Sequence, residues 1–272
     1  MKRHRVRAII GNELRQVARG RDYLLPLGLL ASLFFVVIPV VMLSMITRIG
    51  ENETAQAAAV ILDTLPETAR QNIEGDRPES RAGYAIAVYL LAPIAIVVPL
   101  TVATAVGAAA IVGERERGTG EFLAHSPATE QEIYVGKLVA ALIPGYLATI
   151  GGFAVYSVIV NLIVGPSMGR WFFPTTDWLL LIFWVVPPFI AVALSVIVMI
   201  SARAKTTAGA QQASQLVSLP VIIIAYFVAT GLLFNAVVAA LVIGAIAWAV
   251  ALIGLARGAR AVSREKLIGV DS

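Results

Sequence analysis

The chain has 272 residues, of which 58% are hydrophobic and only 14% are charged. A soluble domain carries about 25% charged residues, so this composition excludes an ordinary soluble protein and predicts a protein that crosses a membrane several times. The net charge of +4 does not indicate nucleic acid as a partner, because the basic residues stand at the ends of apolar runs. The absence of cysteine excludes disulfides, thiolate catalysis and cysteine-bound metals.

The first 21 residues are basic and amphipathic. Four apolar side chains recur there at helical spacing: Val6, Ile10, Leu14 and Val17. Arginines occupy the remaining faces, so we expect residues 1–21 to form a helix along the inner membrane surface. The alternative is a solvated basic leader that does no more than set the orientation of the chain in the membrane. The next apolar run is too long for a signal peptide, so we expect the N-terminus to be retained.

Six apolar segments are each long enough to cross a hydrocarbon core of about 30 Å as a helix. They cover residues 23–46, 84–112, 138–164, 178–201, 211–229 and 232–256. The predicted fold is therefore one all-α polytopic membrane domain over residues 1–272 with six transmembrane helices. Prolines inside the segments predict kinks at Pro93, Pro99, Pro187, Pro188 and Pro220. Two small-residue pairs predict close helix contacts: Ala103 with Gly107, and Ala240 with Gly244.

The distribution of Lys and Arg predicts the orientation of the chain. Of the 21 basic residues, 16 lie on the side of the two termini and 5 lie on the other side. Because cytoplasmic loops carry the excess of basic residues, both termini are predicted to be cytoplasmic, including the tail of residues 257–272. The connection of residues 47–83 then lies outside. Thr64 and Glu67 within it match the start of a short helix with a Thr cap.

The predicted spans lack the ionisable side chains on which several classes of transporter depend. None of them contains Asp, Glu, Lys, Arg or His. Ion-coupled carriers usually place an ionisable group inside the membrane, which argues against an ion-driven carrier. The single Gly-Lys pair, Gly136 and Lys137, lacks the upstream glycine of a phosphate-binding loop.

We therefore expect no catalytic residue, no metal site and no ATP-binding motif in this chain. If it moves cargo uphill, a partner must supply the energy. Two alternatives stay open: a passive channel or secondary carrier, and a non-transporting membrane protein such as an assembly or sensor subunit.

A charged stretch over residues 113–137 separates the second and third predicted spans. Gly118 and Gly120 permit a sharp reversal of the backbone, because glycine adopts a positive φ without steric cost. A short helix that carries Phe122 and Leu123 is predicted to follow. Such an apolar body with a charged rim suits docking in the groove of a partner protein.

The end of this stretch also has a local signature. Pro127 ends the predicted short helix, and Thr129 with Glu132 forms a capping box for the helix that enters the third span. An ordinary solvated loop, whose Glu and Arg side chains neutralise each other, is the alternative to docking.

The order of residues in this stretch resembles the ABC-2 type permeases, the membrane subunits of ATP-binding-cassette exporters, with the sodium-exporter-like branch as the nearest match. The matching pieces are Gly-Glu-Arg-Glu-Arg-Gly-Thr from Gly113, Glu-Phe-Leu from Glu121, Ser-Pro from Ser126, and Gly-Lys from Gly136. The basic N-terminal helix is similar to the elbow helix of that family. Gly120 departs from the pattern, because family members commonly carry a large apolar residue after Gly-Thr.

The resemblance implies that residues 113–137 contain a coupling helix in the cytoplasm, which docks on a nucleotide-binding subunit. The implied contact residues are Glu114, Glu116, Gly118, Thr119, Glu121, Phe122, Leu123 and Pro127. The implied partners are two copies of an ABC ATPase, which bind ATP and Mg, and a second copy of this permease or a related one. The implied location is a prokaryotic inner or plasma membrane, and this chain itself is expected to hold no cofactor.

Polar side chains in two of the spans are candidates for lining a translocation pathway. They are Gln211, Gln215 and Ser218 in the fifth span, and Tyr156 and Asn161 in the third. Buried polar groups in a membrane seek partners, so hydrogen bonding between helices explains the same residues. The apolar spans are compatible with lipids, peptides, antibiotics and amphiphilic drugs as cargo, whereas the lack of a carboxylate in the membrane argues against sodium.

Overall fold

The computed structural model describes residues 2–48, 51–116, 127–201 and 236–261, together with residues 209, 212, 216, 219, 220 and 222–224. In this part of the chain, 5 helical segments are long and apolar enough to cross a membrane: Leu25–Thr47, Pro78–Gly107, Gln131–Ile163, Thr176–Ile197 and Val237–Gly254. They overlap five of the six predicted spans. The remaining predicted span, residues 211–229, falls mostly outside the described residues.

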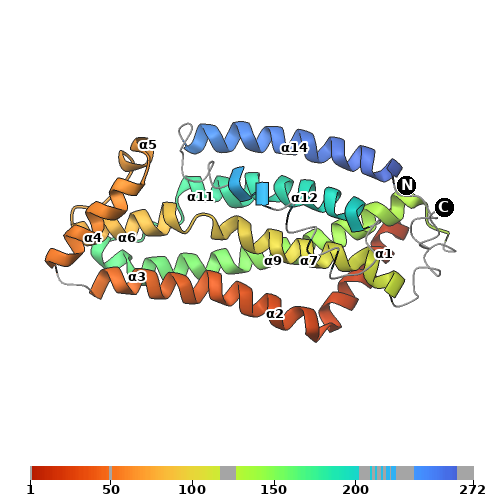
Figure 1. Ribbon diagram of the computed structural model, residues 1–272, viewed down its shortest axis with the longest axis horizontal. Helices are drawn as coiled ribbons and strands as arrows, with labels where there is room; N and C mark the ends of the chain where they lie inside the picture. The colour runs from red at the N-terminus through yellow and green to blue at the C-terminus, as the bar shows by residue number, and fades with distance from the viewer. Residues whose placement is uncertain are drawn as a thin grey trace.

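The elements follow one another as a series of long, side-by-side helices (Figure 1). The first part comprises α1 (Arg3–Arg19), α2 (Arg21–Ser32), η1 (Leu33–Val37), α3 (Ile38–Arg48), α4 (Glu51–Thr64) and α5 (Glu67–Arg70). The second span consists of α6 (Pro78–Ala85), η2 (Ile86–Leu90) and α7 (Ile94–Glu116), and the third is α9 (Glu130–Ile163). The last part comprises α10 (Gly165–Met168), α11 (Thr176–Leu180), η3 (Leu181–Val185), α12 (Val186–Ser201) and α14 (Ala236–Ala261).

The bundle has two distinct ends (Figure 1). We call one the α1 end, because α1 lies there beside the start of α9. The other is the α4 end, where α4 packs against α6. The second and fourth spans are mostly buried within the chain, whereas only a minority of the residues in the first, third and last spans are buried. Those three spans therefore offer apolar surface to lipid or to another subunit.

Small residues allow the buried helices to approach closely. A Cβ atom added to Gly107 of α7 would lie 2.6 Å from Leu194 of α12, and one added to Gly244 of α14 would lie 2.3 Å from the indole of Trp184. Ala103 and Ala240 are also buried. Both predicted close contacts are thus confirmed, since a side chain at either glycine would push the helices apart.

Three spans widen into a π turn shortly before a proline. η1 precedes Pro39, η2 precedes Pro93, and η3 precedes Pro187. Proline has no N–H and its ring collides with the preceding turn, so the helix widens or breaks there. The predicted disturbances at Pro93 and Pro187 are therefore present, and the one at Pro93 is a complete interruption between η2 and α7.

The interruption in the second span leaves backbone carbonyls without their usual helical donors. Leu91 N–H donates to Ile86 O and Ala92 N–H donates to Tyr89 O, and Pro93 has no N–H to give. Side chains from other spans occupy the vacated acceptors. The Tyr156 hydroxyl donates to Ala87 O at 2.6 Å, and Trp178 Nε1 donates to Val88 O at 2.9 Å.

These two donors are part of a buried aromatic cluster formed by Phe153, Tyr156, Phe173 and Trp178. The rings of Tyr156 and Trp178 stack at a centroid distance of 5.0 Å, and Phe173 meets both edge to face. Trp178 is 1% exposed and Tyr156 is 0% exposed. The cluster fixes the third and fourth spans against the interruption, because a carbonyl without a partner is costly where water is excluded.

Replacing Tyr156 by Phe should therefore destabilise the chain by about 1–3 kcal/mol, because it removes only the hydroxyl and leaves Ala87 O unpaired. The free energy of unfolding in mixed detergent micelles measures this change. Tyr89→Phe is the matched control, because the Tyr89 hydroxyl has no hydrogen-bond partner among the described residues. Equal stability of the two variants would contradict the assigned role of Tyr156.

The connection at the α4 end differs in detail from its prediction. A helix does begin at Glu67, but its N-cap is Pro66 and no side chain caps it. Thr64 ends α4 instead, where its hydroxyl donates to Ile61 O at 2.7 Å. The predicted Thr cap is wrong because α4 continues from Glu51 to Thr64 and occupies that residue.

Candidate functional site

The α1 end contains the contacts closest to the predicted coupling segment, by which we mean the implied contact residues from Glu114 to Pro127 and the chain between them. α1 forms because its apolar side chains recur at helical spacing, and it packs along the first turns of α9 (Figure 1). Val6 and Glu13 are the buried residues of α1, and Ile9 and Val17 pack against the core. The face of α1 that touches α9 is therefore apolar with one carboxylate in its middle. We call this contact the α1–α9 junction.

A glycine brings the two helices of the junction together. A Cβ atom added to Gly136 of α9 would lie 2.7 Å from Cγ2 and 3.0 Å from Cβ of Ile9. Real Cβ atoms do not approach other carbon atoms this closely, so only glycine leaves room for Ile9 at this point. Gly136 thus sets the separation of α1 and α9.

The next residue, Lys137, forms a buried ion pair across the same junction. Lys137 Nζ donates to Glu13 Oε1 at 2.8 Å, and the two side chains are 1% and 10% exposed. A buried charge is costly unless it is paired and hydrogen-bonded, so each of these groups requires the other. The ion pair fixes the register of α1 on α9.

The start of α9 is capped as the sequence predicts. Glu132 N–H donates to Thr129 Oγ1 at 3.3 Å, and Thr129 N–H donates to Glu132 Oε2 at 3.0 Å. The beginning of α1 contacts the same carboxylate, because Lys2 N–H donates to Glu132 Oε1 and Arg5 Nη1 lies 3.7 Å from Glu132 Oε2. One carboxylate therefore joins the cap of α9 to the first turn of α1.

Arg5 also reaches the end of the predicted coupling segment. Its Nη1 donates to the backbone carbonyl of Pro127, and Pro127 itself is exposed. The first turn of α1 thus binds Pro127 before Ala128 and Glu132 after it. Both of these residues come shortly after residues 117–126. The junction anchors the point at which that segment enters α9.

Enlarging Gly136 tests the tight contact of the junction. Gly136→Ala should destabilise the chain by about 1–3 kcal/mol, because the added methyl group collides with Ile9. Adding Ile9→Ala should recover most of this loss by making room for the methyl group. Unfolding in mixed micelles measures both values, and a double variant no more stable than Gly136→Ala alone would contradict the contact.

The predicted coupling residues divide into two groups. Glu114 and Glu116 lie in the last turn of α7, and Pro127 lies just before α9. The other five lie outside the described residues: Gly118, Thr119, Glu121, Phe122 and Leu123. Their docking role stays a prediction.

The candidate pathway residues also divide. Gln211, Gln215 and Ser218 lie outside the described residues. Tyr156 and Asn161 are buried in α9, and both make hydrogen bonds to other parts of the chain. The Asn161 side chain donates to Phe173 O at 2.6 Å and accepts from Phe172 N–H at 3.0 Å and Phe173 N–H at 3.1 Å. These bonds fit the alternative reading, in which the two side chains form hydrogen bonds that hold the fold together. A pathway role for either residue stays a prediction.

Sequence reasoning missed three residues of the junction. Glu13 was not singled out, although it lies within the apolar stripe of α1 and a carboxylate on such a face signals a buried partner. Gly136 and Lys137 were noted as an incomplete phosphate-binding motif and as part of the family resemblance, but not as contacts of α1. A lysine at the head of an apolar helix is the corresponding signal, but which acid it meets depends on contacts 124 residues apart in the sequence.

Comparison with known families gives one clear result. The family model of the ABC-2 family transporter proteins matches residues 7–243, which include most of α1, residues 117–126 and every described span up to the first part of α14. No curated protein matches the chain. The match covers most of the sequence and agrees with the multi-pass helical architecture. This chain belongs to the ABC-2 family of transporter proteins, which are membrane components of ABC transporters.

Proposed function

We propose that this chain is the membrane permease subunit of an ABC exporter and that separate ATPase subunits drive it from the α1 end. The observation that carries the proposal is the α1–α9 junction, because it anchors α9 directly after the segment that resembles a coupling helix. Family membership supports the permease role. Export as the direction, the sodium-exporter-like branch, and a complex of two permeases with two ATPases follow from the resemblance.

The connections of the coupling segment support a mechanical role. Residues 117–126 join the end of α7 to the start of α9, and these two helices pack against each other. α9 has 34 residues, which corresponds to a helix of about 50 Å, and its far end lies at the α4 end. A partner that displaces the segment would therefore move two helix ends together and transmit the displacement across the membrane.

The α1–α9 junction holds the start of α9 in place during this movement. The buried face of α1 is fixed to α9 by Glu13 and Ile9, whereas Arg3, Arg7 and Arg15 are exposed. Exposed arginines on an amphipathic helix bind anionic lipid headgroups. We infer that α1 lies on the cytoplasmic membrane surface and holds the start of α9 at that depth.

The positions of the charges argue against an ion-driven carrier. In the five described spans, the acidic and basic residues are Glu79, Arg81, Glu132, Lys137 and Asp177, and each stands in the first two turns of its span. Carriers usually bind the coupling ion near the middle of the membrane. The energy for uphill transport therefore comes from a partner in this proposal.

Purification of the tagged chain from its native membrane in mild detergent tests the partnership. We expect an ATPase subunit to co-purify in about a 1:1 ratio, and the complex to hydrolyse ATP. Gly136→Ala with Ile9→Ala is a useful control, because it alters the junction and leaves the coupling segment intact. A folded chain that purifies without any ATP-hydrolysing subunit would contradict the proposal.

A further inference from the structure

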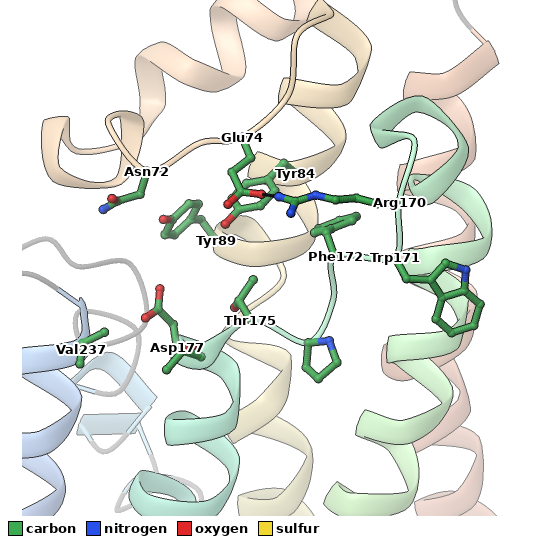
Figure 2. Close-up of a pocket in the computed structure, with 12 residues that line it drawn as sticks. Asn72, Glu74, Tyr84, Tyr89, Arg170, Trp171, Phe172, Thr175, Asp177 and Val237 are labelled. Carbon is green, nitrogen blue, oxygen red and sulfur yellow. Dashed lines mark hydrogen bonds and ion pairs between the residues drawn. The ribbon is translucent and has the colours of Figure 1, made fainter.

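A cavity opens at the α4 end of the bundle, whereas the α1–α9 junction lies at the other end (Figure 1). Figure 2 shows the residues that line it. Its volume is about 460 Å³, which is the size of a small-molecule pocket rather than of a single ion. It lies between the loop after α5, the helices α6 and η2, the loop after α10 with the start of α11, and the start of α14. Segments far apart in the sequence therefore build it together.

The described lining of the cavity carries an excess of negative charge. Glu74 and Arg170 form an ion pair across one edge, so their charges offset each other. Asp177 is half-buried, points toward Tyr89 (Figure 2), and has no hydrogen-bond or ion-pair partner among the described residues. Within the described lining, one acidic group is therefore left without a counter-charge.

Aromatic rings stand beside this carboxylate. The ring centroids of Tyr84 and Tyr89 are 6.4 Å apart, and those of Tyr84 and Phe172 are 5.4 Å apart in a stacked pair. Tyr89 is only 2% exposed, so its ring is held rigidly at the cavity wall. Trp171, by contrast, points away from the cavity (Figure 2).

A further polar atom of the lining has no partner. Thr175 Oγ1 is buried and makes no hydrogen bond within the described part of the chain, and Thr175 does not cap α11. Buried hydroxyl groups normally find a partner, so such an atom at a cavity wall is available to a ligand.

We propose that this cavity binds an organic ammonium group. A lone carboxylate attracts a cation, and aromatic faces attract an ammonium group that is weakly hydrated and carries alkyl substituents. An anionic ligand would meet the uncompensated charge of Asp177, and a neutral ligand would leave that carboxylate without a counter-charge. The proposal concerns binding to this chain and does not depend on the proposed coupling to an ATPase.

Calorimetric titration of the purified chain in dodecyl maltoside micelles tests the charge requirement, because these micelles contain no ammonium group. Choline is the probe, and 3,3-dimethylbutan-1-ol is its neutral analogue with carbon in place of nitrogen. We expect choline to bind at least about tenfold more tightly than the alcohol. Equal affinities for the two would overturn the proposal.

Two substitutions in the cavity should change the affinity for choline in opposite directions. Asp177→Asn should weaken choline binding by about tenfold or more, because it removes the uncompensated charge and keeps the shape. Asp63→Asn is the matched control, since Asp63 is an exposed acid at the same end but outside the cavity lining. Arg170→Gln should tighten binding several-fold, because it leaves Glu74 uncompensated as well.

Because the two variants should change choline affinity in opposite directions, loss of folding cannot account for both results. Structural damage can explain weaker binding by Asp177→Asn, but it cannot explain tighter binding by Arg170→Gln. Weaker or unchanged binding by a folded Arg170→Gln variant would overturn the proposal, as would wild-type affinity in Asp177→Asn.

The ammonium group could belong to a lipid headgroup or to a water-soluble amine, and lipid addition separates these sources. Phosphatidylcholine, whose headgroup carries the same trimethylammonium group, should compete with choline when added to the micelles if headgroups enter the cavity. An unchanged choline affinity in its presence would identify a water-soluble amine as the ligand. Either result supports an ammonium site, whereas a failure of choline to bind in the absence of the lipid overturns it.

Discussion

Replacing Phe122 and Leu123 together by Asp should abolish transport while the chain still inserts into the membrane. In the proposed function these two side chains are the apolar anchor of the coupling segment. Removing an anchor that fills a partner's pocket typically costs about 2 kcal/mol or more, so docking should weaken at least about 30-fold. Insertion should be unaffected, because the substitutions add charge outside every apolar span.

Three measurements on the double variant separate docking from folding: its amount in the membrane, the ATP turnover of the complex, and transport into vesicles. Val60→Asp is a suitable control, because it places the same charge on an exposed residue of α4 at the other end of the bundle. We expect the control to transport normally. Normal transport by the Phe122→Asp, Leu123→Asp variant would remove the docking assignment.

Lys137→Met should be the most destabilising single change at the α1 end. It leaves the Glu13 carboxylate buried without its ammonium partner, and breaking a buried ion pair in this way costs about 3–5 kcal/mol. The same change should loosen α1 from α9 and lower transport. Unfolding in mixed micelles measures the stability, and vesicle transport measures the consequence for function.

Two further variants show whether the loss arises from the ion pair. The double variant Glu13→Gln, Lys137→Met should recover much of the stability, because both charges are then absent. Arg77→Met breaks the exposed pair with Glu79, whose oxygen lies 3.5 Å away, and should cost about 1 kcal/mol or less. If Lys137→Met were no more harmful than Arg77→Met, the ion pair would not hold the junction.

The capping box of Thr129 and Glu132 predicts where the helix of the third span starts, and α9 does begin at Glu130. Apolar periodicity, by contrast, starts the span itself only at residue 138, after Glu132 and Lys137. The prediction stopped at these charges because an unpaired charge is excluded from a membrane core. In the folded chain α1 supplies their partners, and this depends on tertiary contacts that the local sequence does not contain.

The interruption of the second span illustrates the same limit. Pro93 is visible in the sequence and predicts the disturbance correctly. The donors that repair it, Tyr156 and Trp178, come from spans 69 and 90 residues away. A polar residue in a span signals that a partner exists, but only the packing of the helices decides which carbonyl it meets.

The cavity at the α4 end was not predicted at all. Its lining comes from four separate loops and helix ends, and no local motif joins them. Asp177 stood just before the predicted fourth span and had no pattern to distinguish it from an ordinary helix-start acid. Its significance arises from the rings of Tyr84 and Tyr89, which the fold brings beside it.

ATP-driven transport in reconstituted vesicles tests the central claim most directly. The purified chain and its ATPase subunit would be inserted together into proteoliposomes preloaded with an amphiphilic cargo on both sides. The account predicts net movement of cargo against its gradient only when ATP and Mg are present on the α1 side and both subunits are included. Equal uphill transport by this chain alone, without nucleotide or ATPase, would contradict it.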